Sequence, residues 1–186
     1  MSGEQRKIMR IYDKDIIRRA ERIKLLLLDV DGVLTDGSLI YTDKGYQIKQ
    51  FNVNDGLGIS LARKAGIKCA VLTAKKTEVV RLRCEDLSID KVYQDVHYKI
   101  EVLQDILGTF SVSEENICFM GDDLIDIPLL RRAGLAVCPP NAVSEAAQFA
   151  HFLTQERGGS GAVREVTDLL VRSQGKWEEV TRRYFE

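Results

Sequence analysis

The sequence lacks an excess of charge of either sign and has few prolines. Its 186 residues include 27 Lys or Arg and 28 Asp or Glu, for a formal net charge of -1, so no strong overall basic field is available to attract nucleic acid. Only three prolines are present, and the balanced charge is unlike that of a disordered chain. With 45% hydrophobic residues, the chain is expected to form a single domain over residues 1–186.

Long apolar runs are also missing. The densest run near the start is Leu25–Leu28, whereas a membrane span needs about 18 or more apolar residues. The first segment stays charged as far as Arg22 and has no apolar signal region, so we expect a cytoplasmic protein with neither a membrane nor a nucleic-acid partner. The four cysteines form no Cys-x-x-Cys pair, and we expect them to be buried thiols in a reducing compartment. They are Cys69, Cys84, Cys118 and Cys138.

What the chain does contain is an alternation of aliphatic, strand-like runs with helix-like segments. Strands are expected at 24–28, 68–72, 92–94, 117–120 and 135–137, and helices at 13–23, 56–65, 77–87, 98–107, 125–132, 144–147 and 162–172. A small β-hairpin is expected at about 38–51, around the turn Thr42-Asp43-Lys44-Gly45. The alternation predicts an α/β fold with a doubly wound parallel sheet, in which ligands bind beyond the carboxyl ends of the strands.

Two acidic residues follow the first predicted strand. Asp29 and Asp31 flank Val30 and precede Gly32. Carboxylates at a buried strand end are costly unless their charge is neutralised, and Mg²⁺ prefers oxygen ligands of this kind. A calcium-binding loop that begins at Asp29 is excluded, because its sixth position is Leu34 instead of glycine.

A second acidic group follows the predicted strand at 117–120. It contains Asp122, Asp123 and Asp126. If the two strands are neighbours, acids from both could surround one Mg²⁺, with Asp123 and Asp126 supporting the direct ligands. The expected ligands are Asp29, Asp31 and Asp122.

Two further strand or loop ends supply groups that suit an anion. Thr73 follows Val71-Leu72, and Lys99 follows the predicted strand at 92–94. A hydroxyl and an ammonium can both hold phosphate oxygens. Alone, each is a weak signal, because such a threonine is usually a helix cap and such a lysine is usually a solvated charge; their order between the two acidic groups makes them informative.

This ordered set resembles the haloacid dehalogenase superfamily of phosphatases. The first motif of that family, Asp-x-Asp-x-x-x-Thr, corresponds to the segment from Asp29 to Thr35. The resemblance implies a Rossmann-like fold without a cap domain. It further implies that Asp29 is the nucleophile, that Asp31 is the general acid and then the general base, and that Thr73 and Lys99 hold the phosphate.

The resemblance is strongest to capless members that act on phosphorylated keto sugar acids, and it extends from about Ile23 to Tyr184. It implies hydrolysis of 3-deoxy-D-manno-octulosonate 8-phosphate in lipopolysaccharide biosynthesis, with Mg²⁺ as cofactor. It also implies a homotetramer built around the hairpin, with a C-terminal tail, about 174–186, that reaches toward a neighbouring site. The substrate contacts that it implies are Asn52, Asn54, Asp55, Gly56, Lys75 and Arg83.

Two positions depart from this family pattern. Lys75 stands where the family has arginine, which removes the bidentate fork that arginine offers a carboxylate, and Ser60 replaces a basic residue. Together with Asp86, these changes leave a nine-carbon nonulosonate 9-phosphate as an alternative substrate. A non-catalytic binding subunit remains the alternative to an enzyme, because a fold does not establish an activity.

Overall fold

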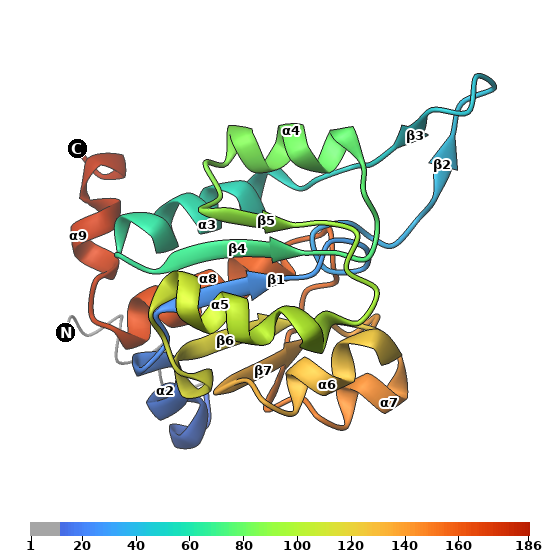
Figure 1. Cartoon of the computed structure of the whole chain (residues 1–186). Helices are drawn as coiled ribbons and strands as arrows, with labels where there is room; N and C mark the ends of the chain where they lie inside the picture. Colours follow the sequence, from blue (N-terminus) through green and yellow to red (C-terminus); the bar gives the residue numbers. More distant parts are fainter. Residues whose placement is uncertain (1–11) are drawn as a thin grey trace.

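The computed structural model describes residues 12–186; the segment 1–11, counted above as part of the domain, lies outside the described residues. A parallel sheet runs through the middle of the molecule, between two helical layers (Figure 1). In spatial order its strands are β5 (Lys91–Tyr93), β4 (Lys68–Leu72), β1 (Leu25–Leu28), β6 (Ile117–Met120), β7 (Leu135–Cys138) and β8 (Phe152–Leu153). The α/β fold with a doubly wound parallel sheet is therefore confirmed, and no cap domain interrupts the described chain.

The helices divide between the two faces of the sheet. One core cluster takes buried residues from α2 (Lys14–Glu21), α3 (Val53–Lys64), α4 (Glu78–Asp86) and α8 (Ala162–Ser173). The other takes them from α5 (Leu103–Phe110), α6 (Ile127–Leu130) and α7 (Ser144–Ala147). Short 3₁₀ turns complete the path: η1 (Lys99–Val102), η2 (Glu114–Asn116), η3 (Leu124–Asp126) and η4 (Arg182–Tyr184).

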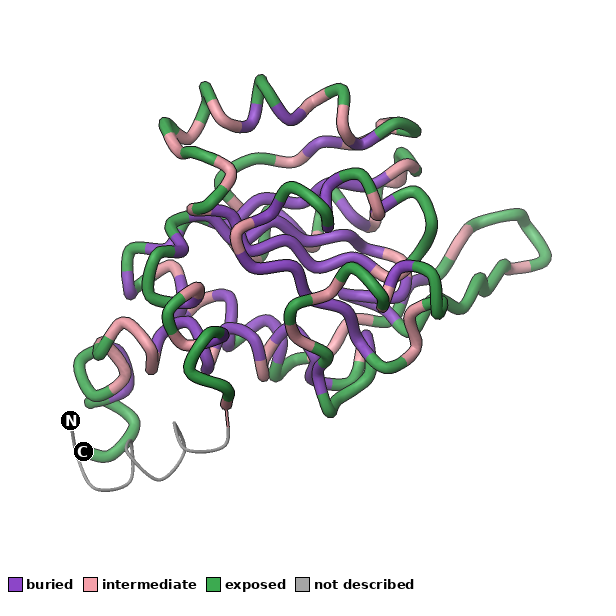
Figure 2. The backbone as a smooth tube through the Cα atoms, turned by 90° about the horizontal axis from the view of Figure 1, so that it is seen from below, coloured by how far each residue is buried: buried purple, intermediate pink, exposed green. Residues whose placement is uncertain are grey.

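The four leucines of β1 explain why this strand is aliphatic throughout. Side chains alternate across a strand, so Leu26 and Leu28 enter one core cluster while Leu25 and Leu27 enter the other. All four are fully buried, and the tube drawing shows the central strands as the most deeply buried part of the chain (Figure 2). A strand that packs on both faces has no solvent side, which is why its sequence shows no polar alternation.

Some element boundaries differ from the sequence predictions. The helix expected at 56–65 begins at Val53, because the Asn52 side chain accepts a hydrogen bond from the Asn54 backbone N–H (2.7 Å) and caps it. The segment expected as one helix at 98–107 begins as the 3₁₀ turn η1 and continues as α5. The two-residue strand β8 was not predicted, since it is too short to carry a pattern.

Two segments stand apart from the central layers. The predicted hairpin is present as β2 (Ile40–Tyr41) and β3 (Gln47–Ile48), and it projects away from the body near the tips of the strands (Figure 1). The tail forms α9 (Trp177–Thr181), which lies at the opposite end of the sheet. All four cysteines are buried free thiols, as expected. In the described part of the chain, no helix is long and apolar enough to span a membrane.

Candidate active site

The residues expected to act in catalysis and metal binding lie together at the carboxyl ends of β1, β4 and β6. Strand β1 pairs with β4 on one side and with β6 on the other, so β4 and β5 are added on one side of β1 and the strands from β6 onward on the other. Open α/β sheets bind ligands at such a switch in strand order. A cavity of about 260 Å³ opens at this edge. Its polar lining includes Asp29, Asp31, Thr73, Lys75 and Asp122.

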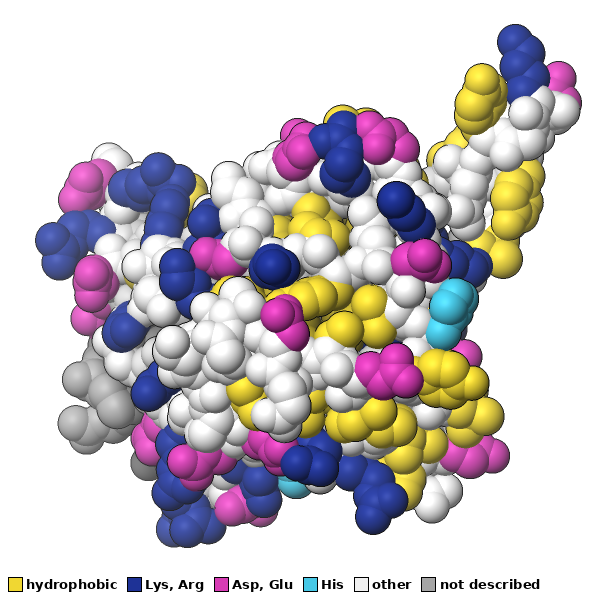
Figure 3. Space-filling model, viewed as in Figure 1, with side chains coloured by type: hydrophobic (Ala, Val, Ile, Leu, Met, Phe, Trp, Pro, Cys, Tyr) yellow, Lys and Arg dark blue, Asp and Glu magenta, His cyan; other side chains and the backbone are white. Residues whose placement is uncertain are grey.

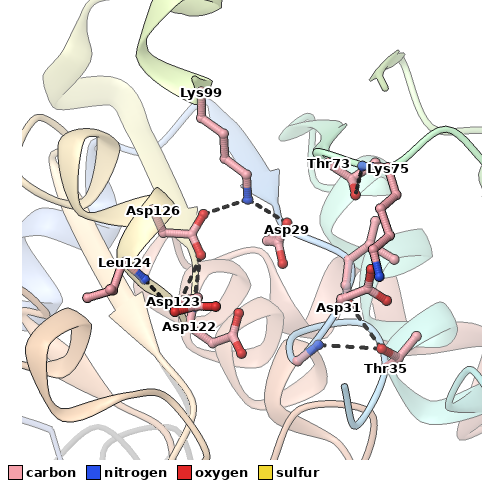
Figure 4. A network of polar contacts seen from close by, with 12 residues as sticks. Asp29, Asp31, Thr35, Thr73, Lys75, Lys99, Asp122, Asp123, Leu124 and Asp126 are labelled. Atoms are coloured by element: carbon pink, nitrogen blue, oxygen red, sulfur yellow. Dashed lines mark hydrogen bonds and ion pairs between the residues drawn. The ribbon is translucent and has the colours of Figure 1, made fainter. Parts of the chain in front are cut away.

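Lys99 links the first and last acidic motifs. Its Nζ lies 2.5 Å from Asp29 Oδ1 and 2.5 Å from Asp126 Oδ1 (Figure 4). Burial alone lowers the pKa of Lys99, but the two carboxylates outweigh burial and raise it. Burial raises the pKa of Asp29, and the Lys99 ammonium opposes that rise. The lysine therefore remains charged and holds the Asp29 carboxylate in place.

Asp126 uses both of its carboxylate oxygens inside the protein. Oδ1 accepts the contact from Lys99, and Oδ2 accepts hydrogen bonds from the backbone N–H groups of Asp122 (2.9 Å) and Asp123 (3.1 Å). The Asp123 side chain in turn accepts from the Leu124 N–H (2.7 Å) and caps η3. These bonds shape the loop that carries Asp122. Asp123 and Asp126 are therefore placed to support Asp122.

The closest group of carboxylates differs from the set expected from the sequence. Among residues 12–186, oxygens of Asp29, Asp122 and Asp126 lie within 4.8 Å of one another. The expected third member, Asp31, turns its carboxylate to the Lys49 ammonium instead. Burial raises the pKa of Asp122 to about 8, and the nearby carboxylates of Asp29 and Asp126 add to the rise. Because these acids repel one another, the group suits a divalent cation.

Hydrogen bonds within the loop after β1 hold this edge of the site. The Thr35 hydroxyl donates to the Val30 carbonyl (3.3 Å) and accepts from the N–H groups of Gly32 (3.4 Å) and Gly37 (3.3 Å). Thr35 is the last residue of the first motif, and it is buried. Thr35 therefore stabilises the loop that carries both Asp29 and Asp31, which explains why the motif ends in a threonine.

Two residues that contact this loop were not predicted. Asn141 follows β7 and donates from Nδ2 to the Gly32 carbonyl (2.8 Å), while its Oδ1 accepts from the Gly158 N–H (2.8 Å). Its position directly after a strand and two prolines is a signal that could have identified it. Lys49 contacts Asp31 from the hairpin region, and no local sequence pattern marks it.

A Gly32→Ala substitution should damage both the loop and the metal ligand. Gly32 has a φ of +87°, and an added Cβ would lie 1.9 Å from Asp122 Oδ2. Gly45→Ala is the matched control, since its φ is +80° but nothing lies within 4 Å of the added Cβ. The control should lose about 1–2 kcal/mol of unfolding free energy. Gly32→Ala should lose more and bind Mg²⁺ more weakly, as measured by urea unfolding and calorimetric titration; equal effects would contradict this prediction.

Most of the expected substrate contacts do not line the cavity. Asp55 accepts from the Arg164 N–H (2.8 Å) beside the start of α8, and Asn52 caps α3. Arg83 donates to the Asn52 carbonyl (3.3 Å) and lies over Gly56, where an added Cβ would come within 2.6 Å of its guanidinium. Asn54 is exposed outside the cavity lining. Of the six expected contacts, only Lys75 is among the described residues that line the cavity; Asn52, Asp55 and Arg83 instead join α3 to α4 and α8.

Comparison with known proteins agrees with this geometry. A family model described as haloacid dehalogenase-like hydrolase matches residues 85–165. The 3-deoxy-D-manno-octulosonate 8-phosphate phosphatase KdsC of Escherichia coli strain K12 is 42% identical over 165 residues, which cover 89% of this chain and 88% of that protein.

Solved structures give the same result. The 3-deoxy-D-manno-octulosonate 8-phosphate phosphatase of Moraxella catarrhalis, in complex with magnesium, phosphate and KDO, superimposes with a TM-score of 0.90 at 31% identity, over 93% of this chain and 99% of that one. The Yersinia pestis phosphatase of the same name gives 0.87 at 38% identity, over 89% of each chain. By this similarity the chain belongs to the haloacid dehalogenase-like hydrolases and, among them, to the 3-deoxy-D-manno-octulosonate 8-phosphate phosphatase family.

Proposed function

We propose that this protein hydrolyses 3-deoxy-D-manno-octulosonate 8-phosphate to 3-deoxy-D-manno-octulosonate and inorganic phosphate, in lipopolysaccharide biosynthesis in the cytoplasm. The observation that carries the proposal is the position of Asp29. It directly follows the central strand β1, lines the cavity, and is held by the buried Lys99. A carboxylate fixed in this way is suited to nucleophilic attack on phosphorus.

Two carboxylates divide the chemistry between them. An Asp29 oxygen forms a bond to phosphorus while the bond between phosphorus and the sugar oxygen breaks. The departing sugar oxygen takes a proton from Asp31. A water oxygen then bonds to phosphorus, its proton passes to Asp31, and the bond to Asp29 breaks, which releases phosphate and restores both side chains. Asp29 and Asp31 both line the cavity, so one bound phosphate can reach both.

Mg²⁺ fits the acidic group described above, with Asp29 and Asp122 as the side chains that would hold it. When bound, the ion supplies positive charge to the phosphoryl oxygens. Asp126 is committed to Lys99 and to two backbone N–H groups, so we assign it the supporting role. The Asp31 carboxylate contacts Lys49 and is not part of the acidic group. We therefore assign Asp31 to proton transfer.

The remaining cavity residues suit the anionic substrate. Thr73 is buried directly after β4, and its hydroxyl accepts from the Lys75 N–H (3.4 Å). The Lys75 side chain extends from there toward Asp31 (Figure 4). Together with Lys99, these groups offer a hydroxyl and two ammonium groups to a phosphate and a sugar carboxylate. Arg83 lies outside this cavity, so we assign the sugar contacts of this chain to Lys75.

The assay that tests this function measures phosphate release with and without Mg²⁺. The panel contains eight-carbon and nine-carbon keto sugar acid phosphates and simple sugar phosphates. The proposal expects a strong preference for the octulosonate. A preference for the nonulosonate would transfer the function to the alternative substrate, and an absence of turnover on every member would refute the enzyme assignment.

The response of stability to pH tests the acidic group by itself. The pKa of Asp122 is about 8 in the folded protein and 3.8 in its reference state, so between about pH 5 and 8 the folded state holds a proton that the unfolded state has released. Stability without divalent cations should therefore fall as pH rises. Mg²⁺ favours the ionised form, so its stabilising effect should grow over the same range.

Thermal unfolding in EDTA and in Mg²⁺ across this pH range provides the measurement. Asp122→Asn is the control, because an amide cannot titrate and the variant should lose most of the pH-dependent Mg²⁺ effect. The same Mg²⁺ effect at every pH in the unmodified protein would contradict the prediction.

We further propose that the protein is a homotetramer built around the hairpin. The hairpin projects from the body and carries apolar side chains at its surface (Figure 3). Those that are at least 47% exposed are Leu39, Ile40, Tyr41, Tyr46 and Ile48. Exposed apolar surface of this kind is typical of a protein interface.

An Ile40→Asp substitution in the hairpin should lower the oligomeric state. Ile40 is 47% exposed in the single chain, so a charge there costs little in a monomer but is strongly unfavourable in an apolar interface. Light scattering after gel filtration measures the mass. Leu82→Asp is the control, since Leu82 is similarly exposed (48%) but lies on α4. A tetramer that survives Ile40→Asp, or a monomeric unmodified protein, would contradict this assembly.

A further inference from the structure

Lys49 is unusual among the residues of the hairpin region. Its side chain is only 1% exposed, whereas the residues on either side of it, Ile48 and Gln50, are both exposed. A lysine side chain is rarely buried unless its charge is paired. The Lys49 side chain is therefore packed into the body of the protein, although its neighbours in the projecting hairpin are exposed.

The Lys49 ammonium contacts Asp31 Oδ1, 18 residues away in the sequence. Asp31 is partly exposed, at 26% of its side chain, and it lines the cavity. The pair thus joins a buried cation to the carboxylate that we assign to proton transfer. A buried ion pair is weak evidence for stability, because removing both charges from water costs much of what their attraction returns.

We infer that Lys49 is a positioning residue for Asp31. The ammonium occupies Oδ1, so a proton carried by Asp31 must sit on Oδ2, the oxygen that remains for the cavity. Oδ2 is then the atom that gives its proton to the leaving sugar oxygen and later takes one from water. The inference rests on the proposed function, and it assigns to the hairpin a second role, that of aligning the acid and base.

A purely structural role for Lys49, as an anchor for the hairpin, makes a different prediction. Loss of an anchor would slow every substrate similarly. Loss of a properly placed proton donor should slow substrates with a poor leaving group most, because an alkoxide needs its proton during bond breaking whereas p-nitrophenolate does not. The ratio of kcat/KM for the two kinds of substrate therefore separates the roles, since kcat/KM includes the step in which the leaving group departs.

The test compares the octulosonate phosphate with p-nitrophenyl phosphate, at saturating Mg²⁺, in the full-length protein. Lys49→Met keeps the length of the side chain and removes its charge, and Lys49→Arg keeps a cation. Asp31→Asn provides the reference pattern for loss of the proton donor. Lys44→Met, at the exposed turn of the same hairpin, is the matched control. Unfolding temperature and molecular mass are measured for each variant.

Lys49→Met should lower kcat/KM for the sugar phosphate about 10- to 100-fold, leave p-nitrophenyl phosphate much less affected, and thus share the pattern of Asp31→Asn. Lys49→Arg should recover part of the loss, and Lys44→Met should match the unmodified protein. Equal losses on both substrates would overturn the inference, as would full activity of Lys49→Met. An unmodified protein that releases no phosphate from the sugar substrate would instead refute the proposed function, so the two failures are distinguishable.

Discussion

Asp29→Asn is expected to abolish phosphate release, with kcat lowered about 10⁴-fold or more, the scale seen when a nucleophile that acts with its partners is removed. The amide has nearly the same shape as the carboxylate but cannot form an acyl phosphate. The fold should survive, because Asp29 is buried and burial disfavours its charged form. Steady-state assays with the octulosonate phosphate measure the loss.

A control variant and a labelling experiment test whether the loss is specific to Asp29. Asp36→Asn changes an exposed acid at the end of the same loop, where Asp36 caps only the Ser38 N–H (2.8 Å), and it should retain turnover. In acid-quenched reactions with labelled substrate, the unmodified protein should carry a hydroxylamine-sensitive phosphate that Asp29→Asn lacks. Substantial turnover by Asp29→Asn, or a label that it retains, would show that another group is the nucleophile.

Lys99→Met should reduce both activity and stability. The lysine is 1% exposed and contacts two carboxylates, so its removal leaves Asp29 and Asp126 close together without a cation. Breaking a buried ion pair in this way costs about 3–5 kcal/mol of unfolding free energy. Loss of the positive charge beside the phosphate should lower kcat by about 10²- to 10³-fold.

Urea unfolding without divalent cations measures the stability effect of Lys99→Met. The loss should shrink at acid pH, because the two carboxylates left behind then become protonated and no longer repel each other. Lys68→Met is the matched control: its side chain is 62% exposed and pairs with Asp90 at 3.0 Å, so it should cost at most about 1 kcal/mol. Similar losses in the two variants would contradict the importance of the Lys99 contacts.

The fold could be predicted well from the sequence because the sheet leaves a local signal. Each central strand is buried on both faces, and this requires continuous aliphatic runs such as Leu25–Leu28. The weakest predictions concerned short or irregular elements. The strand Phe152–Leu153 has two residues, and the start of α3 depends on the Asn52 cap, so neither produces a periodicity that extends over several residues.

The candidate site could be predicted in part. Asp29 and Thr73 directly follow strands, and Asp122 is separated from the end of β6 by one residue. Parallel strands bring their carboxyl ends to one edge, so sequence order was enough to gather these residues. The expected substrate contacts stay predictions, and their place in the sequence does not reveal the partners that the structure gives them. Asp55 bonds to the N–H of Arg164, 109 residues away, and Arg83 bonds to the carbonyl of Asn52.

The sequence by itself determined the doubly wound sheet and the edge at which the acids gather, since both depend on runs of a few adjacent residues. Only the tertiary structure decided how each charge is paired. It placed Lys99 between Asp29 and Asp126 and turned Asp31 toward Lys49. Pairing depends on distances between side chains from separate elements, and the packing of the whole sheet and its helices sets those distances.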